Sequence, residues 1–341
     1  MKVAVVILNW NGEQMLRQFL PSVVEHSILP PSMGEAVVYV ADNGSTDGSL
    51  ALLADVFPTV RTIVLDKNYG FAEGYNRAFE QIDAEYAVLL NSDVEVTPGW
   101  LLPLVEYMDA HLQVAACQPK LMAYHHREQF EYAGAMGGYL DRYGYPYCRG
   151  RIFDTVERDH HQYDADVPLL WATGACLTVR LAVYKEVGGL DGRFFAHMEE
   201  VDLCWRLRCR GHEVRSVAGS VVYHVGGATL NAGNPRKTFL NFRNNLLMLY
   251  KNLPEGELRR VLFVRGVLDY VAAAMFCVKG EWGSARAVLR ARREYRRLKS
   301  EFRASRADNL LKATSMDIPE RACFSILWRY HIGRRHTFDK L

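Results

Sequence analysis

The chain has 341 residues, of which 49% are hydrophobic and 23% charged. These values exclude an intrinsically disordered chain and predict one large or two modest globular domains. The seven cysteines are odd in number and include no CxxC pair, which excludes a disulfide framework and favours a reducing compartment. Net charge is only +2, but residues from Lys279 onward carry 16 Lys and Arg against 7 Asp and Glu. This basic tail predicts an anionic partner, such as a membrane surface.

The chain start and the apolar segments bear on localisation. The N-terminus, Met1-Lys2-Val3, enters a predicted strand at once and has no hydrophobic region of a signal peptide. The segment nearest to transmembrane length, residues 261–278, contains Arg265 and Asp269 on one helical stripe. We therefore expect this helix to dock on protein or on a membrane surface rather than to span a bilayer. The expected location is cytoplasmic, or peripheral on the inner face of the membrane.

Apolar runs alternate with amphipathic segments through the first 111 residues. Short apolar runs predict buried strands, and longer segments between them predict helices. The predicted strands are residues 3–8, 37–41, 62–65 and 86–90, and the predicted helices are residues 13–26, 49–56, 70–82 and 98–111. Strand and helix alternating with short links predict parallel βαβ units, and so an α/β fold.

The second half of the chain is less regular. Residues 124–166 are rich in Tyr, Gly and His and predict a hairpin or a mobile loop. The run 170–179 predicts a strand, a turn and a second strand. Further strands are predicted at 114–117 and 221–224, and helices at 181–187 and 199–210, with mostly helical structure from Arg236.

Polar turns follow three of the first four predicted strands. These turns are Asn9-Trp10-Asn11-Gly12, a run that starts at Asp42, and Asn91-Ser92-Asp93. In open α/β sheets, ligands bind at the carboxyl ends of the strands, so these turns predict one polar cluster at that edge. A carboxylate such as Asp93 can hold a hard cation there, and the cation can hold phosphates.

Four motifs occur in a specific order. They are Asp42-Asn43-Gly44-Ser45-Thr46-Asp47, Asn68-Tyr69-Gly70-Phe71-Ala72, Asn91-Ser92-Asp93 and Glu199-Glu200-Val201-Asp202-Leu203. This set resembles the family 2 glycosyltransferases of the GT-A fold. Asn91 stands where other members have the first Asp of Asp-x-Asp, as in the rhamnosyltransferase-like branch.

The resemblance implies a fold and a reaction. The fold is a Rossmann-like GT-A catalytic domain over residues 1–235, followed by a helical C-terminal extension over residues 236–341. The reaction is the inverting transfer of a sugar from a nucleotide-diphosphate sugar, with Mg²⁺ or Mn²⁺ as cofactor.

The resemblance also implies roles for single residues. Glu200 is the expected general base, although the family usually has Asp there, and Asp93 and His224 are the expected metal ligands. A carboxylate base takes the proton of the attacking hydroxyl, and the cation stabilises the departing diphosphate. The other expected site residues are Asn9, Asp42, Asn68, Asn76 and Ser92 for the nucleotide, and Trp171, Gly174, Glu199 and Asp202 for the donor sugar or acceptor.

Structural explanations stay open for several of these residues. Asp42 also fits the start of a turn, and Asn68 also fits the turn before Gly70. Asp202 pairs with Arg206 at i+4 on a helix, or it binds the acceptor. Trp171 stacks on a sugar ring or packs in the core. The acids at 199–202 also provide favourable charge at a helix N-terminus.

The basic tail contains an amphipathic helix within residues 284–303. Its apolar stripe, Val288, Ala291, Tyr295, Leu298 and Phe302, is surrounded by Arg and Lys. Such a helix lies on anionic lipid, or its stripe packs on the catalytic domain or on a second subunit, which leaves a homo-oligomer open. No nucleic-acid-binding module is recognised, and no nucleic-acid partner is expected.

The preferred hypothesis is an inverting glycosyltransferase in cell-surface polysaccharide synthesis. The donor is UDP- or dTDP-linked, with rhamnose suggested by the resemblance, and the acceptor is a saccharide or a lipid-linked saccharide. One alternative is a nucleotidyltransferase, although residues 9–12 lack the expected Gly-rich basic loop. The other is a non-catalytic nucleotide-sugar or lipid-binding subunit, because Asn91 and Glu200 depart from the commonest motifs.

Overall fold

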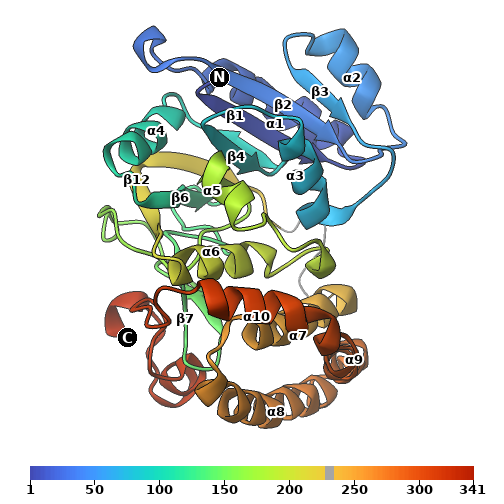
Figure 1. The fold of residues 1–341 in the computed structure, drawn as a ribbon, viewed down its shortest axis with the longest axis vertical. Coiled ribbons are helices and arrows are strands. Elements are labelled where there is room, and N and C mark those ends of the chain that lie inside the picture. Colours follow the sequence, from blue (N-terminus) through green and yellow to red (C-terminus); the bar gives the residue numbers. More distant parts are fainter. Residues whose placement is uncertain (227–233) are drawn as a thin grey trace.

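A mixed eight-stranded sheet forms the centre of the upper part of the molecule in the computed structural model, which describes residues 1–226 and 234–341 (Figure 1). In spatial order its strands are β3 (Arg61–Val64), β2 (Ala36–Asp42), β1 (Val3–Asn9), β4 (Tyr86–Leu90), β11 (Cys176–Arg180), β6 (Val114–Ala123), β12 (Glu213–His224) and β5 (Val94–Val96). The first four are parallel, as predicted, and β11 and β5 run against their neighbours.

Helices cover both faces of this sheet. Successive residues of a strand point to opposite faces, so a strand buried on both faces is apolar throughout. In β1, Val3, Val5 and Ile7 belong to the core that also contains side chains of α1, α2 and α4. Ala4 and Val6 belong to the core on the other face, with α3, α5 and α6. The central strands are therefore held by two hydrophobic cores.

The helices continue through the C-terminal region. Four of the predicted helices, those expected at residues 13–26, 49–56, 181–187 and 199–210, are found within one residue of their predicted ends. The helices are α1 (Glu13–His26), α2 (Ser49–Val56), α3 (Gly70–Glu80), α4 (Leu101–Ala110), α5 (Leu181–Glu186), α6 (Glu199–Cys209), α7 (Pro235–Asn252), α8 (Glu255–Val278), α9 (Trp282–Leu298) and α10 (Arg303–Lys312).

A second, small sheet lies within residues 124–166, for which the sequence predicts either a hairpin or a mobile loop. Four short strands pair there in the order β10 (Thr155–Val156), β9 (Arg151–Ile152), β8 (Pro146–Cys148) and β7 (Gly138–Leu140), so the hairpin alternative is confirmed. The first of the two strands predicted in 170–179 is wrong. Trp171 makes only an isolated bridge to Gly138, and regular pairing begins at Cys176.

Strand β6 extends six residues beyond its predicted end because tertiary contacts satisfy its polar residues. Gln118 and Lys120 are buried in the strand. Gln118 Oε1 accepts a hydrogen bond of 2.9 Å from the backbone N–H of Thr173, and Lys120 Nζ lies 2.8 Å from Asp159 Oδ2. A buried polar group with such partners no longer opposes strand formation.

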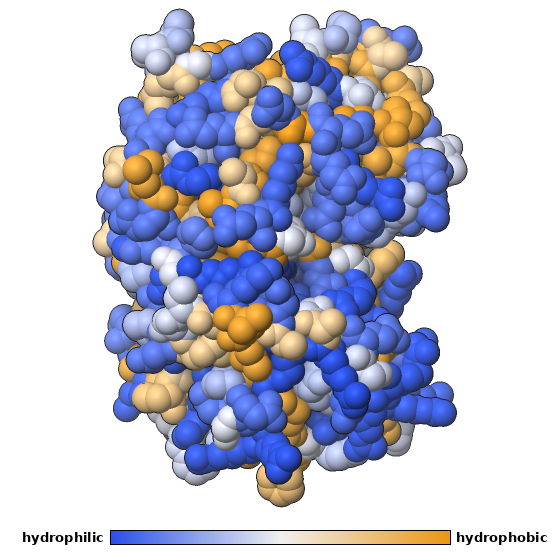
Figure 2. Space-filling view, viewed as in Figure 1, coloured by the Kyte–Doolittle hydropathy of each residue, from blue (hydrophilic) through white to orange (hydrophobic). Residues whose placement is uncertain are grey.

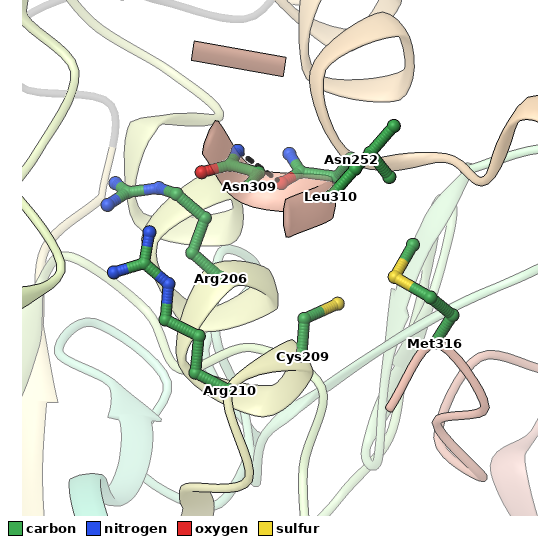
Figure 3. Close-up of a pocket in the computed structure, with 7 residues that line it drawn as sticks. All are labelled: Arg206, Cys209, Arg210, Asn252, Asn309, Leu310 and Met316. Atoms are coloured by element: carbon green, nitrogen blue, oxygen red, sulfur yellow. Dashed lines mark hydrogen bonds between the residues drawn. The ribbon is translucent and has the colours of Figure 1, made fainter. Parts of the chain in front are cut away.

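A buried ionic cluster joins α6 to the C-terminal helices. Asp202 Oδ2 accepts from Arg206 Nε at 2.9 Å and from Lys251 Nζ at 2.7 Å, and its Oδ1 accepts from Asn252 Nδ2 at 2.7 Å. Beside it, Asn309 of α10 donates to Asn252 across the seam between α6, α7 and α10 (Figure 3). Asp202 is wholly buried, so the pairing with Arg206 is confirmed and the acceptor-binding role expected for Asp202 is wrong.

We expect Asp202→Asn to destabilise the protein by about 3–5 kcal/mol, because it leaves buried cations without their shared carboxylate. Urea unfolding measures the change in the free energy of unfolding. Arg17→Gln is the matched control, because it breaks an ion pair with Glu13 in which the Arg17 side chain is 60% exposed. That control is expected to cost less than about 1 kcal/mol. Equal losses in the two variants would contradict a structural role for the cluster.

The apolar stripe of the basic segment faces inward. Val288, Ala291 and Phe302 have no exposed surface, and Tyr295 is also buried. The sequence leaves open whether this stripe of residues 284–303 contacts lipid or packs on protein. Packing on the protein body is correct, and contact of the stripe with lipid is wrong. The stripe packs because α9 lies against α7 and α8.

Candidate active site

The carboxyl ends of β1, β2, β4 and β12 meet at one edge of the main sheet. Register places Asn9 beside Asp42, and β4 ends next to them at Leu90. On the other side, His224 at the end of β12 pairs with Val94, directly after Asp93. The sheet topology thus brings together residues from four distant parts of the chain.

Asp93 and His224 form the acidic corner of this edge. His224 Nε2 lies 3.2 Å from Asp93 Oδ1 and 3.4 Å from Asn91 Nδ2. The backbone fixes the pair, because Val225 donates its N–H to the Asp93 carbonyl at 3.1 Å. Both side chains are buried.

Glu131 completes this corner and was not expected from the sequence. Its Oε1 lies 3.3 Å from His224 Nδ1, and its Oε2 accepts from the Ala133 N–H at 2.6 Å. Burial alone would lower the pKa of His224, but the carboxylates of Asp93 and Glu131 raise this pKa to about 10. A carboxylate on the far ring nitrogen is the usual partner of a metal-binding histidine.

The donor set fits a divalent cation. One carboxylate and one imidazole, with diphosphate oxygens supplied by a substrate, match the oxygen-rich shells of Mg²⁺ and Mn²⁺, and the imidazole favours Mn²⁺. A cation bound there competes with the proton on His224.

Asn9 and Asp42 form the second part of the edge. Asn9 Nδ2 donates to Asp42 Oδ2 at 3.0 Å, and the Ser45 N–H donates to Asp42 Oδ1 at 2.9 Å. Asn9 Oδ1 is buried and has no partner within the described part of the chain. It lies beside Gly12, where a Cβ would come within 2.4 Å of it, with Ser92 Oγ also close. An unpartnered buried acceptor at this edge points to a ligand that donates a hydrogen bond.

The loop after β2 is tied to the start of α3. Asn68 Oδ1 accepts from the Gly70 N–H at 2.8 Å, so Asn68 fixes the turn before Gly70. Asn43 accepts from the Tyr69 N–H at 2.9 Å and donates to the Gly70 carbonyl at 3.0 Å. Gly70 has φ +79°, and a Cβ there would lie 2.6 Å from the Phe195 ring. The motif at residues 68–72 thus brings the loop at Phe195 close to the loop that follows Asp42.

A strained loop carries the acids of α6. Phe195, His197 and Met198 have positive φ values of 67°, 71° and 74°, a conformation rare for such residues. Asn244 of α7 holds the loop, since its Nδ2 lies within 3.0 Å of the carbonyls of Phe194, Ala196 and His197. The sequence gives no signal for this role of Asn244.

Glu199 and Glu200 begin α6 with unpartnered buried oxygens. One carboxylate oxygen of each side chain is buried without a hydrogen-bond partner in the part that the structure describes. Burial raises the pKa of Glu200 to about 7. Burial, with the adjacent Glu200 charge, raises the pKa of Glu199 further. Glu200 is the more accessible of the two, so it offers a carboxylate that titrates near neutrality.

Gly174 lies between Glu200 and the Asn91-Ser92-Asp93 turn. A Cβ on Gly174 would be 3.9 Å from Glu200 Cβ and 3.1 Å from the Phe71 ring. The next residue, Ala175, accepts the Asn91 N–H through its carbonyl at 2.9 Å. Gly174 therefore leaves space beside Glu200, within one residue of a direct hydrogen bond to the Asn91-Ser92-Asp93 turn.

Two expected site residues lie in the protein framework. Trp171 is buried against Gly138 and donates its Nε1–H to the Tyr139 carbonyl at 3.0 Å, so the sugar-stacking alternative is wrong. The amide of Asn76 donates to the Leu190 carbonyl at 2.7 Å and accepts from the Tyr184 hydroxyl at 2.6 Å. With these partners Asn76 fixes the loop after α5, so its expected place in the nucleotide pocket is also corrected.

A second group with metal-ligand chemistry lies elsewhere. Asp159, His161 and Asp164 bring their ligand atoms within 4.8 Å of one another. Lys120 pairs with both of these carboxylates, and His161 is 82% exposed. The lysine already neutralises part of the charge that a cation would need.

Solved structures with low sequence identity share this fold. GalNAc-T7, determined with UDP, GalNAc and Mn²⁺, superposes with a TM-score of 0.62 at 15% identity, covering 98% of this chain and 57% of that chain. TarS residues 1–349 of S. aureus, determined with UDP-GlcNAc, superposes with a TM-score of 0.57 at 16% identity, covering 91% and 89%. The fold is GT-A, with a helical C-terminal region.

Sequence comparisons show which family the N-terminal part of the chain resembles. Residues 4–157 match the model of glycosyl transferase family 2. The N-acetylglucosaminyl-diphospho-decaprenol L-rhamnosyltransferase of Mycobacterium tuberculosis is 28% identical over 244 residues, which are 66% of this chain and 76% of the relative. The O-antigen biosynthesis protein RfbC of Myxococcus xanthus is 27% identical over 236 residues, 68% of this chain but 18% of RfbC. Over residues 4–157 the chain is therefore similar to glycosyltransferase family 2, and over a longer stretch it is similar to an L-rhamnosyltransferase.

Proposed function

We propose that this enzyme transfers a sugar, with inversion, from a UDP- or dTDP-linked donor to a hydroxyl of a saccharide or lipid-linked acceptor in cell-surface polysaccharide synthesis. The observation that carries the proposal is the meeting of Asn9, Asp42, Asp93, His224 and Glu200 at one sheet edge. The two relatives are named for an L-rhamnosyl transfer to a decaprenol-linked sugar and for O-antigen synthesis. These names support rhamnose and a lipid-linked acceptor.

Asp42 and Asn9 are the proposed base-recognition pair. Uracil and thymine present an N3–H, and a carboxylate held in place by Asn9 and Ser45 is a suitable acceptor. The unpartnered Asn9 Oδ1 provides a second acceptor beside it. In this proposal Asn68 acts indirectly by fixing the turn, and Ser92 lines the same pocket.

Asp93 and His224 are the proposed ligands of the divalent cation, which supplies charge stabilisation for the departing diphosphate when bound. Glu131 holds the His224 ring in its orientation. On the acceptor side, Glu200 accepts the proton of the attacking hydroxyl, and Gly174 leaves space for the sugar. Glu199 is buried, and burial raises its pKa above the usual range, which disfavours a second negative charge in this space.

A thermal-shift screen with UDP, dTDP, GDP and CMP, each with and without Mn²⁺, tests the donor class. We expect UDP or dTDP to stabilise the protein only with the metal, by about 2.7 kcal/mol at a hundredfold excess over Kd. Asp42→Asn is expected to reduce this shift, whereas Asp55→Asn on the surface of α2 leaves it unchanged. Stabilisation by GDP or CMP alone would contradict the base assignment, and release of pyrophosphate instead of a nucleoside diphosphate would contradict glycosyl transfer.

A further inference from the structure

Helix α8 has an inverted distribution of polar and apolar residues. Within residues 261–278 the only charged side chains, Arg265 and Asp269, are buried, and every exposed residue is apolar. The large exposed ones recur at helical spacing and form what we call the apolar ridge: Phe263, Val267, Tyr270, Val271, Met275 and Val278. Phe263 is 74% and Val278 89% exposed, and Trp282 at the start of α9 is also exposed. A soluble surface helix normally shows the opposite arrangement.

The buried charges fix α8 to the protein body. Arg265 donates to the Tyr143 carbonyl at 3.0 Å and contacts Asn245 of α7, and Arg292 of α9 pairs with Asp269 at 2.5 Å. By length and composition α8 is the helix, among those in the described ranges, that is long and apolar enough to cross a membrane. These partners instead hold it lengthwise on the body, with the ridge outward.

The surroundings of the ridge are basic. Arg259 and Arg260 precede it and Lys279 follows it, all exposed. Of the acids near the ridge, Glu255 pairs with Arg306 and Glu257 pairs with Arg321. Glu281 is the remaining acid beside it. A groove of about 330 Å³ beside the start of α8 is lined by Arg142, Arg260 and the Glu257–Arg321 pair, so two of its arginines add net positive charge. Cationic groups at both ends of an apolar stripe match the anionic headgroups and acyl chains of a bilayer surface.

The position of α8 suits a flat surface. It lies across the end of the molecule opposite the N-terminus (Figure 1), and a small hydrophobic group projects at the tip of that end from a mostly hydrophilic face (Figure 2). We propose that the apolar ridge of α8 docks this enzyme on an anionic lipid bilayer, with the helix lying in the interface. The proposal does not depend on the identity of the donor or acceptor, so its test uses neither.

Flotation of the full chain with phosphatidylcholine vesicles, with and without phosphatidylglycerol, tests this proposal. We expect binding to the anionic vesicles and a loss of more than about tenfold in the partition coefficient when Val267→Glu and Val271→Glu are combined. The combination of Ile28→Glu and Leu112→Glu, which places the same two charges on residues that are 67% and 76% exposed outside α8, is the matched control and should bind like the wild type. Thermal melts verify that all variants are folded.

Three results would overturn the proposal. The first is no vesicle binding by the wild-type protein, and the second is unchanged binding by the ridge variant. The third is a dimer in sedimentation velocity that the ridge variant dissociates, together with no vesicle binding, which would make the ridge a subunit interface. In the second case, a further variant that combines Arg286→Glu with Arg290→Glu identifies the contact. If this variant loses vesicle binding while the ridge variant keeps it, the contact is purely electrostatic and made through α9.

Discussion

Replacing Glu200 by Gln should lower kcat by about 10²–10⁴-fold, because the amide cannot accept the proton of the attacking hydroxyl. The change keeps the shape of the side chain and removes only its basicity. Burial raises the pKa of Glu200 to about 7, so wild-type activity should rise as pH increases through about 7, where the carboxyl loses its proton. Initial rates of nucleoside diphosphate release between pH 5 and 9 measure both effects, and the Glu200→Gln variant should lose the acidic limb.

The adjacent Glu199 supplies a matched control for this experiment. Burial and the Glu200 charge raise the pKa of Glu199 well above its usual range, which favours its neutral form over the carboxylate. Glu199→Gln therefore resembles the native state and should leave kcat close to that of the wild type. If Glu199→Gln were inactive and Glu200→Gln active, the two acids would have exchanged roles.

Replacing Asp93 by Asn should lower metal-dependent activity by about 10²–10³-fold or more, since it removes the proposed anionic ligand of the cation. Isothermal titration of Mn²⁺ into the protein with UDP measures affinity separately from turnover. Glu131→Gln should weaken Mn²⁺ affinity by about 10–100-fold, because Glu131 orients His224 and does not itself bind the metal in this proposal. Asp93→Asn is thus expected to reduce Mn²⁺ affinity more than Glu131→Gln does.

The surface cluster around His161 offers the control for metal binding. Asp159→Asn alters a group of potential ligands in which Asp159 already pairs with Lys120, so it should leave both Mn²⁺ affinity and activity unchanged. A loss of affinity confined to Asp159→Asn would move the metal site to that cluster. Unfolding curves for Asp93→Asn, Glu131→Gln and Asp159→Asn separate ligand loss from loss of stability.

The sequence predicts the N-terminal half of the fold well because its signals there are local. Strands β1, β2 and β4 are apolar runs with polar turns at their carboxyl ends, and α1 and α2 have regular apolar spacing. The parallel order follows from alternating strands and helices, so the edge that joins Asp42 to Asp93 was predictable before the structure. The small sheet at 138–156 was less predictable because its strands have only two or three residues.

Sequence by itself therefore determined the resemblance to family 2 glycosyltransferases, the main sheet and the residue types at the carboxyl ends of its strands, since periodicity and motif order are properties of neighbouring positions. Tertiary structure decided which acids are free to act and which are not. Asp202 matches a family motif but lies in a buried ionic cluster, whereas Glu131 matches none and contacts His224. It also decided that the stripe of α9 packs inward and that the ridge of α8 faces solvent. An amphipathic pattern specifies that a helix has two faces, but only packing against the rest of the chain specifies which face is buried.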